Sequence, residues 1–216
     1  MLISHKNKFI TIDIPKTGSR SLRETLYPLG IVDVVGEPIL NAKFYQHGTA
    51  DQCAQSLLQD GNKFSDYFSF CLVRNPWDRY FSFFKYFKTY AQKFEDKDPS
   101  IKWGAAEINQ GEYCVSLFKD HTNEQVMRSI IINHQAQSDF FTNQSGEVIV
   151  NHIACFENIN EEFEIFCKQI GIQPLNLKHG NKSKNFLDKK HFFTNELIDL
   201  VADKEELIIK LKGYKF

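Results

Sequence analysis

The sequence predicts an α/β fold around a mostly parallel sheet, because strand-like segments alternate along the chain with helix-like ones. The first strand is expected over residues 9–14, where isoleucines alternate with Thr11 and Asp13 until Pro15 ends the pattern. Leucines then recur at helical spacing over residues 22–29. This stretch is therefore a strand, a tight loop and a helix.

A second unit of the same kind follows. Residues 67–73 form a nearly unbroken apolar run, which is typical of a parallel strand buried on both faces. Arg74 ends the run, Asn75 is expected to cap a helix, and Pro76 suits the first helical position. Aromatic side chains then recur along one face of this helix, namely Trp77, Tyr80, Phe81, Phe84 and Phe87.

The rest of the chain gives weaker signals. Residues 95–125 are polar and mixed, and we expect a lid or an insertion on the substrate side. Short strands are expected within 147–156, and Asn160 is expected to cap a helix. A basic loop spans 178–190, and a last helix is expected from about 194 to 211.

Length and composition limit the possible functions. The 216 residues suit a single domain spanning 1–216, and the net charge of −1 gives no overall field to attract nucleic acid. No signal peptide and no transmembrane stretch is evident. The five cysteines are odd in number and contain no CxxC pair, so we expect reduced thiols in a cytoplasmic protein.

The loop after the first strand, PKTGSRS at 15–21, is suited to bind a phosphate. A small-residue loop that opens a helix offers free N–H groups and the positive end of the helix dipole. Two cations and three hydroxyls add to it, so the candidate residues are Lys16, Thr17, Gly18, Ser19, Arg20 and Ser21. The alternative is a plain turn with a surface lysine. Because the lysine precedes the only glycine, the loop is not a Walker A motif, and no metal is implied.

Arg74 provides a second candidate anion site. Its fork-shaped guanidinium follows a strand end, and Ser82 lies about two helical turns further on the same side. These two side chains are expected to share one phosphate. The alternative is a capped amphipathic helix with a solvated arginine. Asp78 is interpreted as a helix cap and Arg79 as its structural partner.

The segments IPKTGSRS and LVRNPWDRYFS together resemble the paired nucleotide-binding signatures of sulfotransferases that use the donor PAPS (3′-phosphoadenosine 5′-phosphosulfate). The resemblance is strongest to the carbohydrate-type branch, which includes heparan and chondroitin sulfotransferases and small bacterial relatives. It implies a P-loop-kinase-like three-layer sandwich. It also implies that residues 16–21 bind the 5′-phosphosulfate, and that Arg74 and Ser82 bind the 3′-phosphate.

The resemblance continues through QSDFF at 137–141, CFENINEEF at 155–163, HGNKSK at 179–184 and the terminal GYKF. It implies that Lys182 and Ser183 close over the nucleotide or bind anions of the acceptor. This sequence departs from the family in having Arg20 where many members have threonine. Asp13 stands where many small members have histidine.

A sulfuryl transfer of this kind needs a general base for the acceptor hydroxyl and a cation for the leaving phosphate. His47 is the histidine between the two signatures, as the base is in heparan-type relatives, and Lys16 suits the leaving group. His134, Asp13 and Glu112 are alternative bases. A further alternative is that His47 is a loop histidine with no part in the reaction. No zinc-binding motif is present in the sequence.

We therefore predict transfer of a sulfuryl group from PAPS to a hydroxyl of a glycan or glycolipid, with PAP as the product and without a metal. A nucleotide kinase-like phosphotransferase on the same fold is one alternative, although it needs a Walker loop and Mg²⁺ ligands. A non-catalytic protein that binds the adenosine bisphosphate is another. The sequence does not name the acceptor.

Overall fold

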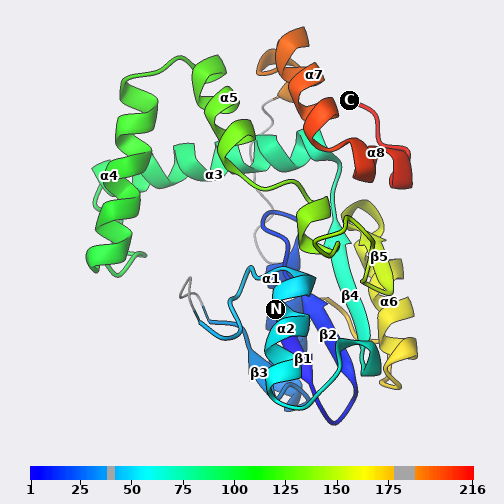
Figure 1. Cartoon of the computed structure of the whole chain (residues 1–216). Coiled ribbons are helices and arrows are strands. Elements are labelled where there is room, and N and C mark those ends of the chain that lie inside the picture. The colour runs from blue at the N-terminus through cyan, green and yellow to red at the C-terminus, as the bar shows by residue number, and fades with distance from the viewer. Residues whose placement is uncertain (38–41, 178–187) are drawn as a thin grey trace.

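A computed structural model describes residues 1–37, 42–177 and 188–216. Within these ranges five strands form one sheet in the order β3-β1-β2-β4-β5 (Figure 1). The strands are β1 (Leu2–Ser4), β2 (Phe9–Ile12), β3 (Val34–Val35), β4 (Phe68–Val73) and β5 (His152–Cys155).

The sheet is mixed, which corrects the expectation of a mostly parallel one. Strand β4 is parallel to both β2 and β5, whereas β1 is antiparallel to both β2 and β3. The reason is local: only residues 5–8 separate β1 from β2, and a connection this short can join only antiparallel neighbours. The predicted strands at 9–14 and 67–73 are confirmed as β2 and β4.

Helices cover both faces of the sheet, so the predicted three layers are present. Side chains of α1 (Ser19–Leu26) and α6 (Ile159–Gln169) share one core with Phe9, Phe70 and Leu72. Side chains of α2 (Ala50–Gln59) share another with Ile10, Cys71 and Val73, whose side chains alternate with the first set along the strands. The α/β part of the predicted fold class is thereby confirmed.

A group of helices, called here the helical subdomain, lies beyond the carboxyl end of β4 (Figure 1). It gathers α3 (Pro76–Glu95), α4 (Ala105–Lys119), α5 (Asn123–Asn133) and α7 (Asn195–Lys204) around an aromatic core. The segment 95–125 therefore contains a helix packed on α3, with Cys114 and Leu117 buried. Gly111 permits this approach, since a Cβ there would lie 2.1 Å from the Phe94 ring.

Two sequence-based expectations about helix ends were wrong. Helix α6 begins at Ile159, after the cap residue Asn158, so Asn160 lies inside the helix. The last helix is broken: α7 ends at Lys204 and α8 (Glu206–Lys212) follows Glu205, whose side chain is buried. Five 3₁₀ turns complete the described elements: Tyr27–Leu29, Phe64–Asp66, Ser138–Phe140, Phe156–Asn158 and Lys189–His191.

The partner predicted for Arg79 was also wrong. Arg79 pairs with Glu205 at 3.0 Å, and both side chains are almost fully buried, whereas Asp78 pairs with Lys189 at 2.9 Å. Asn75 caps α3 as predicted, because its side chain accepts a hydrogen bond from the Asp78 N–H. Among the described residues no helix is both long and apolar enough to cross a bilayer.

Candidate functional site

The two predicted anion-binding motifs meet at one edge of the sheet. Strands β2 and β4 run parallel in register, with Ile12 opposite Cys71, so the loops that follow them emerge side by side. A guanidinium nitrogen of Arg74 (Nη1) donates to the carbonyl oxygen of Lys16 across 3.4 Å. The neighbouring positions predicted for the two motifs are therefore confirmed.

The loop before α1 is held in an unusual backbone conformation. Both Lys16 and Gly18 have positive φ angles, 69° and 91°. The hydroxyls of Thr17 and Ser19, predicted from the sequence as phosphate donors, donate instead to the Ile14 carbonyl at 2.9 and 3.4 Å and so stabilise the loop. No side chain caps α1, and the half-buried Ser21 closes its first turn through its N–H. The start of α1 thus keeps its positive dipole end uncapped.

Phe156 packs beneath both motifs. A Cβ at Gly18 would lie 2.7 Å from the Phe156 ring, so only glycine fits this close approach. The guanidinium of Arg74 lies 4.7 Å from the centroid of the same ring. This residue follows β5, the strand next to β4, and sequence analysis placed it in the CFENINEEF segment without a role.

Lys16 and Arg74 are two half-buried cations at neighbouring strand ends. Burial, followed by the charges of Arg74 and Lys85, lowers the pKa of Lys16 to about 8. Burial also lowers the pKa of Arg74, and the nearby charges of Asp78 and Glu157 oppose this. Within the described ranges no carboxylate forms an ion pair with Lys16 or Arg74. Two partly desolvated cations without a direct ion-pair partner among the described residues form a site that favours an anion.

A buried polar network joins the two motifs. The Nε of Arg79 donates a hydrogen bond to the Pro15 carbonyl at 3.1 Å, and its Nη1 donates one to the Glu205 carboxylate at 3.0 Å. Glu205 also accepts the backbone N–H of Gln137 at 3.0 Å. The Gln137 side chain then binds the backbone of Arg74 twice, accepting from its N–H at 2.8 Å and donating to its carbonyl at 2.9 Å. In the sequence, the segment that contains Gln137 was noted only because it resembles the same segment of the family.

His47 lies at the same edge in a defined tautomer. Its Nδ1–H donates to the Asp13 carbonyl at 2.8 Å, which leaves the lone pair on Nε2. The Gln46 side-chain amide donates to this Nε2 at 3.2 Å. Burial lowers the pKa of His47, although the hydrogen bond to Asp13 opposes the shift. The Asp13 carboxylate is itself buried between Arg23 and the Met1 amine. His47 is therefore a neutral imidazole at pH 7.

A family model that describes sulfotransferases matches residues 1–205, which include both motifs and His47. The chain belongs to the sulfotransferase family. The resemblance to PAPS-dependent sulfotransferases seen in the sequence is thereby confirmed, and the carbohydrate-type branch is consistent with the family. Neither a curated protein nor a solved structure gave a significant match.

The remaining predicted site residues of this sulfotransferase have different surroundings, and two of them lie outside the described ranges. The Arg20 side chain is 71% exposed and pairs with Glu24 at 2.6 Å, so its guanidinium lies on the outer face of α1. Ser82 is half-buried on α3. Lys182 and Ser183 lie outside the described residues.

The alternative bases of the sulfotransferase have different surroundings. His134 donates to the Ile130 carbonyl at 2.9 Å, and its ring lies 4.2 Å from that of Phe83 and 5.6 Å from that of Phe87. His134 therefore packs within the helical subdomain. Glu112 is exposed on α4. In the described part of the chain, no three metal-ligating side chains gather into one group.

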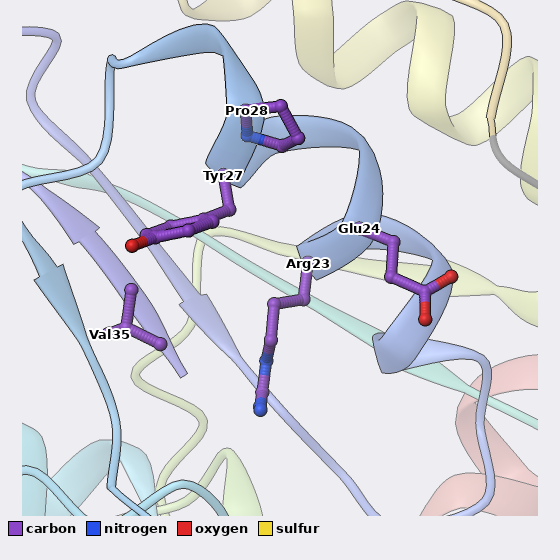
Figure 2. A pocket seen from close by; sticks show the side chains of 5 residues that line it. All are labelled: Arg23, Glu24, Tyr27, Pro28 and Val35. Carbon is purple, nitrogen blue, oxygen red and sulfur yellow. The ribbon is translucent and has the colours of Figure 1, made fainter.

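A cavity of about 520 Å³ lies between α1 and β3 (Figure 2). Its lining residues are Arg23, Glu24, Tyr27, Pro28 and Val35. Ion pairs with Asp13 and Arg20 neutralise its two charged members, so the wall is largely apolar. The Nε of Arg23 is the one buried side-chain polar atom without a hydrogen-bond partner in the described ranges.

Proposed function

We propose that this sulfotransferase moves a sulfuryl group from PAPS to a hydroxyl of a glycan or glycolipid. The observation that carries the proposal is the half-buried pair of cations Lys16 and Arg74, neither of which forms an ion pair with a carboxylate among the described residues. A donor with anionic groups at both ends of its ribose requires cations at two neighbouring points. Arg74 and Lys16 supply them from adjacent strand ends.

The residues fit such a donor. The uncapped start of α1 and Lys16 suit the 5′-phosphosulfate, because the backbone N–H groups and the helix dipole favour an anion there. Arg74 and Ser82 suit the 3′-phosphate, and the Phe156 ring supports the guanidinium from below. PAPS, when bound, supplies a sulfuryl group activated by its bond to a phosphate oxygen.

The chemistry then needs one proton acceptor and one stabilising cation. His47 accepts on Nε2 the proton that the acceptor hydroxyl loses as its oxygen bonds to sulfur. Lys16 stabilises the electron pair that stays on the bridging oxygen as the old bond to sulfur breaks. In the free protein the amide of Gln46 donates to His47 Nε2 at 3.2 Å. We propose that the acceptor hydroxyl replaces this donor when it binds.

Calorimetry tests the donor assignment. Arg74→Ala should weaken binding of 3′-phosphoadenosine 5′-phosphate by about 10- to 100-fold, which is the worth of one charge-assisted phosphate contact, and should barely affect AMP. Arg128→Ala is the matched control, since that arginine is partly exposed on α5 and pairs with Glu196. Equal losses for both nucleotides would place Arg74 outside the 3′-phosphate site.

Turnover with labelled PAPS and a panel of hydroxylated glycans and glycolipids tests the reaction. His47→Ala should lower turnover by about 10²–10⁴-fold and leave nucleotide affinity nearly unchanged, with the exposed His121→Ala as control. Lys16→Ala should lower turnover by about 10²–10³-fold. Nucleotide binding without transfer to any acceptor would favour a non-catalytic binding protein. Phosphoryl transfer from ATP and Mg²⁺ would favour a kinase-like enzyme.

A further inference from the structure

The ammonium group of Lys16 lies over an aromatic ring. Its Nζ is 4.3 Å from the centroid of Tyr86, a residue one helical turn beyond Ser82 on α3. A cation at this distance is attracted by the negative face of the ring. The positive φ of Lys16, 69°, fixes the direction in which the side chain leaves the loop. The contact therefore joins the first motif to the helix that follows the second.

The charges around Lys16 make this contact important. Arg74, from the loop after β4, and Lys85, from α3, both lower the pKa of Lys16 together with burial. Across the described ranges no carboxylate pairs with the Lys16 ammonium, and the Tyr86 ring is the one favourable partner of its charge. Burial raises the pKa of the Tyr86 phenol, so the ring stays neutral in the pH range in which Lys16 titrates.

We propose that Tyr86 is a positioning residue for Lys16: its ring keeps the ammonium protonated and in place beside the anion site when no donor is bound. The inference rests on the proposed function, because it assigns Tyr86 a task in sulfuryl transfer. Tyr86 itself is 44% exposed and belongs to neither nucleotide signature, so no sequence pattern singles it out.

The proposal predicts a specific pH dependence. Lys16 acts as a cation, so kcat/KM for the donor should fall as pH rises through about 8 in the wild-type protein. Tyr86→Leu keeps an apolar neighbour but removes the ring, which should lower the pKa of Lys16 by about half a unit to one and a half units. The alkaline fall in kcat/KM should move to lower pH by the same amount.

A labelling experiment measures this pKa without any donor or acceptor. Trace acetic anhydride is applied to the free protein between pH 6 and 10, and mass spectrometry follows acetylation of the peptide that contains Lys16. Half-maximal reactivity should lie near pH 8 in the wild type and in Tyr86→Phe, which keeps the ring, and at lower pH in Tyr86→Leu and Tyr86→Met. Tyr113→Leu, which removes another exposed tyrosine, should match the wild type.

Kinetics provide the second readout. Tyr86→Leu should lower kcat/KM by about 1.5- to 8-fold at pH 7.5 and by little at pH 6.5, a pattern that lost stability alone would not produce. In a Lys16→Ala background the same change should have no further effect. Unchanged Lys16 reactivity in folded Tyr86→Leu, or an equal shift in Tyr86→Phe, would overturn the proposal. Because labelling needs no turnover, it remains informative even if sulfuryl transfer is never found.

Discussion

Glu205 is the residue whose replacement should show most clearly how the fold supports the site. It lies between α7 and α8 with its side chain fully buried. Its carboxylate accepts hydrogen bonds from Arg79 at 3.0 Å, from the Tyr80 hydroxyl at 3.1 Å and from the Gln137 N–H at 3.0 Å. Glu205→Ala leaves all three donors without this acceptor, and one of them is a buried cation.

The magnitude follows from the burial of the pair. Removing one partner of a buried ion pair costs about 3–5 kcal/mol, because the remaining charge stays uncompensated in the interior. In a protein of this length each kcal/mol lowers Tm by about 2–4 °C. Glu205→Ala should therefore lower Tm by about 6–20 °C. Any folded fraction should also bind the nucleotide more weakly, because Arg79 contacts Pro15 and Gln137 contacts Arg74.

Urea denaturation followed by tryptophan fluorescence and circular dichroism measures the change in the free energy of unfolding. Glu206→Ala is the matched control at the next position, because Glu206 is exposed and its one ion pair within the described ranges is with Lys210, one turn away. Its effect should stay within about 0.5 kcal/mol. A loss below about 1 kcal/mol for Glu205→Ala, with an unchanged denaturant slope, would refute the reasoning that this network supports the two motifs.

Two further substitutions test individual contacts. Gly18→Ala should lower both stability and nucleotide affinity, because its positive φ costs about 1–2 kcal/mol for alanine and its Cβ would meet the Phe156 ring. Gly146→Ala, with a similar φ but open space around it, should show the backbone cost alone in the same denaturation and calorimetry. His134→Leu should change stability but leave turnover intact, since His134 packs against Phe83, and a large loss of turnover would return it to the candidate bases.

The parts of the fold that sequence analysis predicted have strong local patterns. Strand β4, predicted from the apolar run at 67–73, is six residues long and buried along nearly its whole length, so its composition identifies it. Strands β1 and β3 were missed because three and two residues are too short to show a period of two. Missing them also hid the antiparallel half of the sheet.

Errors in the remaining predictions came from interactions between distant residues. Arg79 was assigned to Asp78 because the two are adjacent, but its partner Glu205 lies 126 positions away. The same distant pairing explains the break in the last helix, where the apolar pattern of residues 194–211 gave no warning of a buried carboxylate. A helical pattern reports which face is apolar and does not report a polar residue recruited to the interior.

The candidate site was predictable where its chemistry lies in consecutive residues. Lys16 and Arg74 follow strand ends, and the topology of parallel strands brings such ends together. Gln137, Tyr86 and Gln46 were not assigned roles, because their contacts with the motif residues are visible only in three dimensions. No spacing rule relates these residues to the motifs that they support.

The site places two cations where burial disfavours their charges, and neighbouring residues contact both of them. Burial lowers the pKa of both Lys16 and Arg74, and the charge of Arg74 lowers the pKa of Lys16 further. Gln137 binds the Arg74 backbone, the Arg74 guanidinium lies over the Phe156 ring, and the Lys16 ammonium lies over the Tyr86 ring. The network around Glu205 stabilises the loops that present these cations. A site held in this way gains most from a ligand with negative charge at both positions, which is why we favour a bisphosphate-type donor over a singly charged one.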